Sequence, residues 1–266
     1  MESIRVVVNG ALGRMGREVT HAVLSNSDLK MVGAGEQEAI QEYLELPMVS
    51  EKIPFSSDLD SLLLACKPDV LVDFTTASSA IKTARITIEH QVNMVIGTTG
   101  LSKENLEELA QLCQNNKQTC IIVAPNFSLG AVLLKHLAKI ASNFFDYAEI
   151  VEMHHEKKID APSGTAIDTA RAMLQTRGKP FTFPKTEKEV IRNTRGGDME
   201  GLTIHSMRMP GFMASQEVVF GGLGQTLRLR HDSINRESFM PGVILAIKEA
   251  VKRKGLIVGL ETLLNI

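Results

Sequence analysis

The sequence predicts an α/β fold, in which a doubly wound parallel sheet is joined to a smaller α+β domain with a mixed or antiparallel sheet. Three observations carry this prediction. Short, continuously apolar runs alternate with helical patterns through the first half of the 266-residue chain. The first of these runs leads directly into a glycine-rich turn. In the second half, strand-like segments follow one another without intervening helices, and a glycine cluster separates two of them.

The first strand and helix carry a fingerprint of dinucleotide binding. An apolar run, Ile4 to Val8, leads into glycines at positions 10, 13 and 16, and a helical pattern follows. A tight turn of this kind lets the backbone approach a pyrophosphate and packs the helix closely on its strand. The usual fingerprint has a glycine where Ala11 stands, so the spacing alone is a weak signal.

The second strand strengthens this interpretation. Leu29 to Val32 form another apolar run, which leads into Gly33-Ala34-Gly35 and then Glu36. The acid therefore comes roughly twenty residues after the first glycine turn, where a carboxylate hydrogen-bonds ribose hydroxyls. The order of strand, glycines, helix, strand and acid predicts a Rossmann-like dinucleotide-binding domain.

The next elements extend the same sheet. We expect a helix at 57–65, with a capping box from Ser57 to Asp60. Further strands are expected at 69–74, 93–97 and 119–124, and further helices at 79–90 and 103–114. Strands that are apolar throughout are typical of a parallel sheet covered on both faces, and such sheets bind ligands at the carboxyl ends of their strands. These ends carry Gly10, Glu36, Phe74-Thr75, Gly97-Thr98-Thr99 and Ala124-Pro125-Asn126-Phe127.

The second half of the chain has a different order of expected helices and strands. Its expected elements are a helix at 129–143, a strand at 147–154, a helix after Ser163, a polar loop at 177–200, and strands at 202–208, 215–220 and 225–231. Glycines 221, 222 and 224 indicate a hairpin between the last two strands. A closing helix at 237–253 and an apolar tail at 256–264 are expected to return to the first domain. We therefore expect one domain at 1–126 with 237–266, and a second at 127–236.

Residues 152–166 carry the strongest chemical signal. They place two imidazoles, two lysines and three carboxylates just before a turn that opens a helix. Pro162 ends the preceding segment and Ser163 is a good N-cap. The unpaired N–H groups of the first helical turn, at Ser163-Gly164-Thr165, can hold an anion. Proton donors, cations and an anion cradle together predict a site for a small acidic substrate; the alternative is a solvated charged loop before an ordinary helix.

A metal site is not expected at His154 and His155. Adjacent strand residues point to opposite faces, and no third ligand has a suitable spacing. The other histidines, at positions 21, 90, 136, 205 and 231, are scattered, and we interpret them as surface or packing residues.

The composition excludes several other classes of protein. Hydrophobic residues make up 44% of the chain, charged residues 23%, and the net charge is −2, so no basic field favours nucleic acid or an anionic membrane. No apolar run approaches the roughly 20 residues of a membrane helix, and the N-terminus shows no signal-peptide pattern. The cysteines Cys66, Cys113 and Cys120 are scattered and odd in number, so we expect buried thiols in a cytoplasmic protein.

Taken together, these motifs resemble those of the 4-hydroxy-tetrahydrodipicolinate reductase family, also called dihydrodipicolinate reductase. The motifs that carry the resemblance are Gly10–Gly16, Asp73-Phe74-Thr75, Gly97–Gly100, Asn126-Phe127-Ser128 and His154–Ala166. The resemblance implies reduction of a cyclic, imine-type dicarboxylate by NADH or NADPH in diaminopimelate and lysine biosynthesis. It also implies a cytoplasmic homotetramer assembled through the sheets of the substrate-binding domain.

The resemblance also assigns roles to individual residues. His154 corresponds to a proton donor or acceptor and Lys158 to a proton donor near the reacting carbon–nitrogen bond. His155, Gly164 and Thr165 correspond to residues that hold the substrate carboxylates. The implied cofactor-binding residues are Gly10, Ala11, Leu12, Gly13, Arg14, Met15, Glu36, Gly97, Thr98, Thr99, Ala124, Pro125, Asn126 and Phe127.

Cofactor choice is where this sequence departs from the family pattern. Many relatives place an arginine directly after the ribose-binding acid, where it meets a 2′-phosphate, and this chain has Gln37. We therefore expect NADH to be used at least as well as NADPH. A basic side chain such as Lys30, or one from the segment 38–53, is the alternative source of a phosphate contact.

Two other functions stay open at this point. An amino-acid dehydrogenase of the aspartate or homoserine type would share the first domain and act on an open-chain substrate. A dinucleotide-sensing regulator would keep the cofactor fold without needing the pair His154 and Lys158. Nicotinamide oxidation that depends on the cyclic dicarboxylate would exclude both.

Overall fold

The computed structural model describes residues 2–46 and 51–266, which form two compact units. The first unit comprises Met1–Phe127 and Phe239–Ile266, and the second comprises Ser128–Ser238. The segment 38–53, named above as a source of basic side chains, includes residues 47–50, which lie outside the described part.

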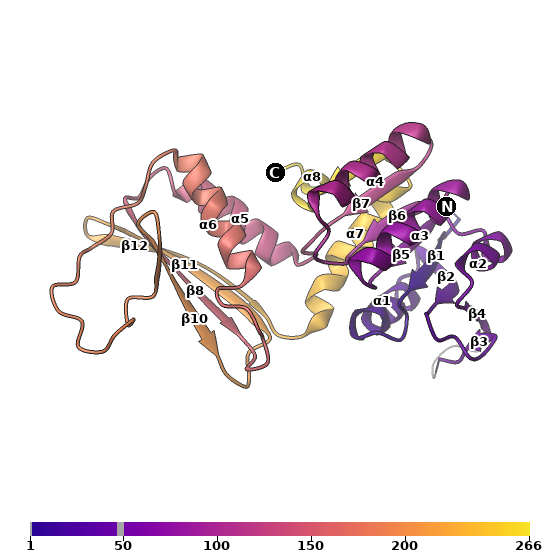
Figure 1. Ribbon diagram of the computed structural model, residues 1–266, viewed down its shortest axis with the longest axis horizontal. Helices are drawn as coiled ribbons and strands as arrows, with labels where there is room; N and C mark the ends of the chain where they lie inside the picture. The colour runs from indigo at the N-terminus through magenta and orange to yellow at the C-terminus, as the bar shows by residue number, and fades with distance from the viewer. Residues whose placement is uncertain (1, 47–50) are drawn as a thin grey trace. The chain divides into compact units, whose positions relative to one another are not determined.

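The first unit is built on an eight-stranded sheet with the order β13-β7-β6-β5-β1-β2-β4-β3 (Figure 1). Its strands are β1 (Ile4–Asn9), β2 (Leu29–Gly35), β3 (Tyr43–Leu44), β4 (Ile53–Ser56), β5 (Val70–Asp73), β6 (Asn93–Ile96), β7 (Cys120–Val123) and β13 (Gly255–Val258). All neighbouring strands are parallel except the edge pair β3 and β4. The predicted doubly wound sheet is confirmed, and the chain returns to it through β13.

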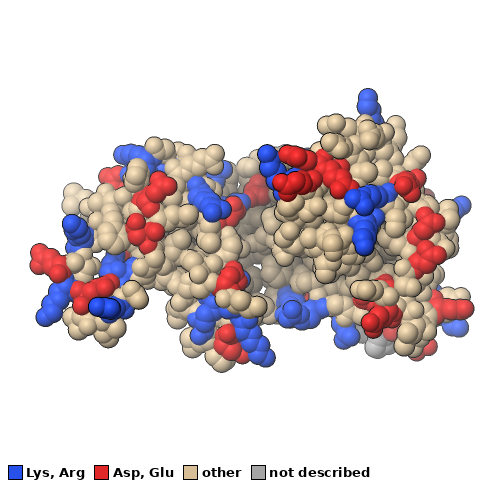
Figure 2. All heavy atoms as spheres, in the orientation of Figure 1, with Lys and Arg blue, Asp and Glu red and all other residues tan. Residues whose placement is uncertain are grey.

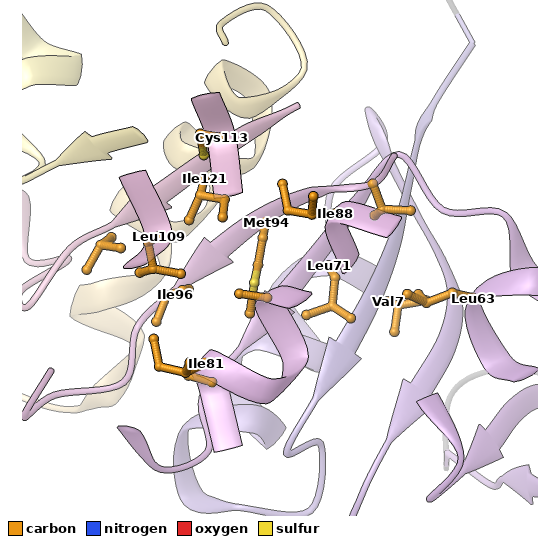
Figure 3. Close-up of a cluster of buried hydrophobic side chains, with 14 of the residues drawn as sticks. Val7, Leu63, Leu71, Ile81, Ile88, Met94, Ile96, Leu109, Cys113 and Ile121 are labelled. Carbon is orange, nitrogen blue, oxygen red and sulfur yellow. The ribbon is translucent and has the colours of Figure 1, made fainter. Parts of the chain in front are cut away.

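Helices cover both faces of this sheet. They are α1 (Arg14–Leu24), α2 (Leu59–Cys66), α3 (Ala77–Glu89), α4 (Lys103–Asn115), α7 (Met240–Ala250) and α8 (Glu261–Leu264). The 3-10 helix η1 (Arg236–Phe239) precedes α7 and contains the boundary between the two units. On one face, Leu71, Met94 and Ile121 of the strands pack against Ile88 of α3 and Leu109 of α4 (Figure 3). On the other face, α1 and α7 contact each other and the sheet. Burial on both faces explains why these strands are apolar throughout.

The structure corrects several element boundaries. The N-cap of α2 is Asp58, whose carboxylate accepts the Ser61 N–H at 3.2 Å, so the predicted capping box from Ser57 to Asp60 is wrong. The glycines after Val32 belong to β2. A Cβ on Gly33 would lie 2.9 Å from the Cys66 sulfur, so this glycine permits close packing inside a strand. The short strands β3, β4 and β9 were not predicted.

The second unit is a five-stranded mixed sheet with the order β12-β11-β8-β10-β9. Its strands are β8 (Tyr147–His154), β9 (Gly197–Met199), β10 (Leu202–Arg208), β11 (Ala214–Gly222) and β12 (Gln225–Ser233), and its helices are α5 (Leu129–Ala141) and α6 (Gly164–Arg177). The predicted hairpin is present as the antiparallel pair β11 and β12. Both helices pack on one face of the sheet, with Ile150 of β8 and Met173 of α6 in the shared core.

Charges on the visible surface are mixed, with basic and acidic side chains interspersed over both units (Figure 2). Among the described residues, no helix is both long enough and apolar enough to cross a bilayer. All three cysteines are buried and unpaired.

Candidate active site

The turn between β1 and α1 is shaped for close approach of a ligand to the backbone. Gly10 has φ +76°, a conformation that side chains rarely adopt. A Cβ on Gly16 would lie 1.9 Å from the Gly10 carbonyl oxygen, so α1 starts directly against the turn. Gly13 is the N-cap of α1, and no side chain caps the helix. The first-turn N–H groups of α1 are thus left for an anion.

Glu36 lies at the end of β2 and reaches across to this turn. Its carboxylate accepts the Leu12 N–H at 3.0 Å and the Gln37 N–H at 3.1 Å. The first of these bonds ties the end of β2 to the glycine turn. An acid that is half-buried at this place is positioned to accept hydrogen bonds from ribose hydroxyls.

A buried carboxylate, Asp73, organises the middle of the same sheet edge. It ends β5 and accepts hydrogen bonds from Asn9 Nδ2 at 2.7 Å, from the Thr75 N–H and hydroxyl at 3.1 and 2.7 Å, and from the Thr98 hydroxyl at 3.1 Å. Asn9 also donates to Thr83. Asp73 therefore joins the ends of β1, β5 and β6. From the sequence it was noted only as part of the motif Asp73-Phe74-Thr75.

Aromatic rings complete this edge. A Cβ on Gly97 would lie 2.1 Å from the Phe74 ring, so glycine is needed for the ring to lie against the backbone after β6. The Phe74 ring contacts that of Phe127, with centroids 5.8 Å apart. The segments Gly97–Thr99 and Ala124–Phe127 thus lie next to each other at the strand ends, as expected from the parallel pairing of β6 and β7.

These features fit a dinucleotide. The uncapped start of α1 suits a pyrophosphate, Glu36 suits a ribose, and the glycines of the first turn leave the backbone accessible. The predicted cofactor-binding residues all belong to the first unit and follow the carboxyl ends of β1, β2, β6 and β7.

The second unit places the candidate proton-handling residues at the end of β8. His154 is the last residue of that strand and Glu152 is two residues earlier, so both project from the same face. His154 Nδ1 lies 2.6 Å from Glu152 Oε2, and the Glu152 side chain is fully buried. Arg208 of β10, which pairs with His154 across the sheet, donates to both Glu152 oxygens at 2.9 and 2.7 Å.

This buried carboxylate is held in its charged form. Burial alone would raise the pKa of Glu152, but hydrogen bonds from His154, Arg208 and Ser206 outweigh burial and lower it to about 2. Glu152 also accepts the Ser163 N–H at 3.2 Å. One carboxylate therefore connects His154 to the start of α6.

The start of α6 is open. Ser163 is the N-cap, and its hydroxyl accepts the Ala166 N–H at 3.2 Å, as expected. Gly164 and Thr165 are exposed, and a Cβ on Gly164 would meet nothing within 4 Å. The Gly164 N–H also hydrogen-bonds the Asp160 carboxylate. A ligand carboxylate can approach the exposed Thr165 N–H and hydroxyl, and it would share the Gly164 N–H with Asp160.

Lys158 is joined to this arrangement through Asp160. Its ammonium donates to the Asp160 carboxylate at 2.7 Å, and this bond lowers the pKa of Asp160 below its usual value. Arg208 donates to the Asp160 carbonyl at 2.7 Å. Lys158 is mostly covered, and its N–H donates to the His155 carbonyl at 3.1 Å.

The structure thus connects His154, Lys158 and the Ser163 cap through contacts, which argues against a solvated loop. The residues that make the connection, Glu152 and Arg208, were not assigned a role from the sequence. The shared face of Glu152 and His154 was a usable signal, because residues two apart on a strand project together. No group of three or more metal-ligating side chains occurs in residues 2–46 and 51–266.

Comparisons with known proteins cover nearly the whole chain. Residues 4–127 match the family model of the dihydrodipicolinate reductase N-terminus, and residues 130–264 match that of its C-terminus. A 4-hydroxy-tetrahydrodipicolinate reductase of Dehalococcoides mccartyi is 50% identical over 266 residues, covering 100% of both chains. The enzyme of the same name from Moorella thermoacetica is 46% identical, covering 99% of this chain and 98% of its own.

A solved structure is similar over the same length. The dipicolinate-bound dihydrodipicolinate reductase from Paenisporosarcina sp. TG-14 has a TM-score of 0.88 and 40% sequence identity, covering 98% of this chain and 99% of its own. Full-length similarity in both sequence and fold decides between the three functions left open by the sequence.

Proposed function

Because the chain belongs to the dihydrodipicolinate reductase family, we propose that its two units divide the tasks of one reaction. The protein is an oxidoreductase that reduces 4-hydroxy-tetrahydrodipicolinate with a nicotinamide cofactor, in diaminopimelate and lysine biosynthesis. The first unit binds the cofactor, and the second binds the substrate and handles the protons. The observation that carries this proposal is the network that links Lys158 and His154 beside the open start of α6.

The substrate is anchored by its carboxylates. One carboxylate accepts hydrogen bonds from the first-turn N–H groups of α6 at Gly164 and Thr165 and from the Thr165 hydroxyl, where the helix dipole favours negative charge. His155, directly after β8, contributes a further donor. The Paenisporosarcina relative, which binds dipicolinate, supports a site for a planar ring with two carboxylates.

Protons come from His154 and Lys158. When bound, the nicotinamide cofactor supplies the hydride. Hydride addition leaves negative charge on the unsaturated ring, and a proton must neutralise it. The Lys158 ammonium donates that proton near the carbon–nitrogen bond. The 4-hydroxyl group must also leave as water before the hydride adds, and the His154 imidazole moves the ring proton released in that elimination to the departing hydroxyl.

The cofactor lies along the carboxyl edge of the first sheet. The start of α1, from Gly10 to Met15, holds the pyrophosphate, and Glu36 holds the adenosine ribose. Gly97–Thr99 and Ala124–Phe127 line the remainder. Asp73 fixes the hydroxyl of Thr98, so it positions this edge without needing to touch the cofactor.

We expect NADH to be used at least as well as NADPH. A 2′-phosphate would meet the Glu36 carboxylate, and Gln37 offers neutral donors in place of the bidentate grip of an arginine. Lys30 pairs with Glu51 at 3.8 Å, and both side chains are exposed. Measured kcat/KM values for both cofactors test this expectation. Gln37→Arg should shift the ratio toward NADPH, whereas a tenfold or greater NADPH preference in the unmodified protein, about 1.4 kcal/mol, would contradict it.

Assembly and location complete the proposal. The face of the second sheet that α5 and α6 leave uncovered carries Val151, Met207 and Val219 between charged residues, and we propose that a homotetramer forms through this face. Light scattering on the purified protein should give four times the mass of one chain, and a monomer would contradict this part. The three buried thiols suit the reducing cytoplasm.

The roles of His154 and Lys158 have a direct kinetic test. His154→Gln and Lys158→Gln should each lower kcat by roughly 10²–10⁴-fold and leave the cofactor dissociation constant nearly unchanged. His21→Gln, on the exposed surface of α1, is the matched control and should retain full activity. Unchanged kcat in both site variants would refute the assignment.

A further inference from the structure

Glu152 is a fully buried carboxylate for which the proposed reaction has no direct use. It lies on β8 with its side chain on the same face as His154, and Arg208 reaches it from the neighbouring strand β10. Buried carboxylates are expensive to desolvate, so their presence calls for a reason.

Apart from Ser206, the donors to Glu152 are charged groups or belong to the site itself. Oε2 lies 2.6 Å from His154 Nδ1 and 2.9 Å from Arg208 Nη1. Oε1 lies 2.7 Å from Arg208 Nη2 and 3.2 Å from the Ser163 N–H. Both oxygens thus have two donors, and the carboxylate cannot rotate without losing several bonds.

This geometry has a consequence for the imidazole. A charged carboxylate only accepts hydrogen bonds, so Nδ1 of His154 must carry a proton. Nε2 is then the ring atom left for exchange: it accepts a proton when the ring is neutral and donates one when the ring is charged.

Arg208 completes the arrangement. Its guanidinium neutralises the buried carboxylate through a bidentate contact, and Nη2 also donates to the Asp160 carbonyl. The same arginine therefore fixes both the carboxylate behind His154 and the loop that carries Lys158.

We propose that Glu152, held by Arg208, is the positioning residue of the site: it fixes the His154 ring with Nδ1 protonated and Nε2 directed to the substrate. This inference rests on the proposed role of His154 in proton handling. It adds a residue that acts through His154 without touching the substrate.

The same strand offers a matched control on its opposite face. Glu149 also binds an arginine and a histidine, with Arg195 Nη2 at 2.7 Å and His205 Nε2 at 2.9 Å. That cluster contains no substrate-binding or proton-handling residue. It lies on the face proposed above for assembly, where Glu149 pairs with Val219, so light scattering must show the same oligomer for Glu149→Gln as for the unmodified protein. Glu149 and Glu152 are the same residue type, lie on the same strand and bind the same kinds of side chain. Glu149→Gln therefore reports the effect of removing a carboxylate from such a cluster without changing the site.

The kinetic test compares these two substitutions. Glu152→Gln keeps the size of the side chain but replaces the carboxylate with an amide, whose NH₂ group can donate to Nδ1 and stabilise the wrong tautomer. We expect kcat to fall by about 10²-fold or more, with the KM for substrate and the cofactor dissociation constant changed less than about threefold. Glu149→Gln should retain kcat within about twofold.

A spectroscopic readout separates positioning from general damage. Nitrogen-15 imidazole spectra, with the His154 signals assigned by their loss in His154→Gln, should show Nδ1 protonated in the unmodified protein. In Glu152→Gln the Nε2-protonated tautomer should gain population. If Glu152→Gln does not fold because Arg208 is left unpaired, the double variant Glu152→Gln with Arg208→Met removes both charges and should fold, with the same loss of kcat and the same change of tautomer.

The outcomes distinguish this inference from the function on which it rests. If His154→Gln is inactive while a folded Glu152→Gln keeps kcat or the original tautomer, the positioning role is wrong and the proposed function stands. If His154→Gln itself is fully active, the proposed role of His154 in proton handling fails, and the positioning role falls with it.

Discussion

Replacing Asp73 with asparagine should destabilise the first unit far more than an isosteric change usually does. The asparagine oxygen can replace Oδ1 and keep the three bonds from Thr75 and Thr98. Its NH₂ group then faces Asn9 Nδ2, which lies 2.7 Å from Oδ2. A charge-assisted bond is lost and two buried donors oppose each other, which together cost about 2–5 kcal/mol.

Thermal unfolding followed by circular dichroism measures this cost. The melting temperature should fall by about 4–20 °C, from the usual 2–4 °C per kcal/mol for a unit of this size. A reversed pair gives the decisive control: Asn9→Asp in the Asp73→Asn background restores a donor facing a carboxylate and should recover at least half of the loss. Asn9→Asp alone should destabilise, because two carboxylates then face each other. Strictly additive effects in this cycle would refute the reasoning.

Two further predictions follow from the same geometry. Gly16→Ala places a methyl group 1.9 Å from the Gly10 carbonyl oxygen, so α1 must shift. Cofactor affinity, measured by fluorescence titration, should fall by tenfold or more. Gly13→Ala, whose new methyl group has its nearest contact at 3.2 Å, should lower cofactor affinity less. The pKa of Glu152 is lowered from 4.5 to about 2, so its charged form stabilises the fold above pH 4.5 by about 3 kcal/mol, and this contribution should be lost as the pH falls toward 2. Urea unfolding of Glu152→Gln should therefore show a free energy that depends less on pH over that range than in the unmodified protein. An unchanged pH dependence would contradict the assignment.

The fold was predictable where its signals are local. The apolar runs that became β5, β6 and β7 stand between helical patterns, and burial on both faces leaves them no polar alternation. The errors arose where a residue type is compatible with two different local structures. The apolar run of the second strand ends at Val32, but β2 continues through Gly33 and Gly35, which admit the Cys66 sulfur and the Asn9 side chain. Ser57 and Asp58 are both good caps, and only the structure shows that Asp58 accepts the Ser61 N–H.

The individual residues of the site were predictable from the sequence, but most of the hydrogen bonds that connect them were not. His154, Lys158 and Ser163–Thr165 are contiguous, so their residue types alone indicated chemistry. Arg208 lies 56 residues beyond Glu152, and the two meet because β10 pairs with β8 in parallel register. Asp73 joins Asn9, 64 residues away, for the same kind of reason. Such contacts depend on the order of strands in a sheet, which no local pattern specifies.

The central claim is that cofactor and dicarboxylate are bound by separate sets of residues in separate units. Calorimetric titration of Thr165→Val and Glu36→Ala with NADH and with pyridine-2,6-dicarboxylate tests it in one crossed experiment. Thr165→Val should weaken only the dicarboxylate, and Glu36→Ala only NADH, each by about 1–3 kcal/mol because a hydrogen bond to a charged group is lost. If each variant weakened both ligands equally, or neither weakened its own, the division of tasks between the two units would be contradicted.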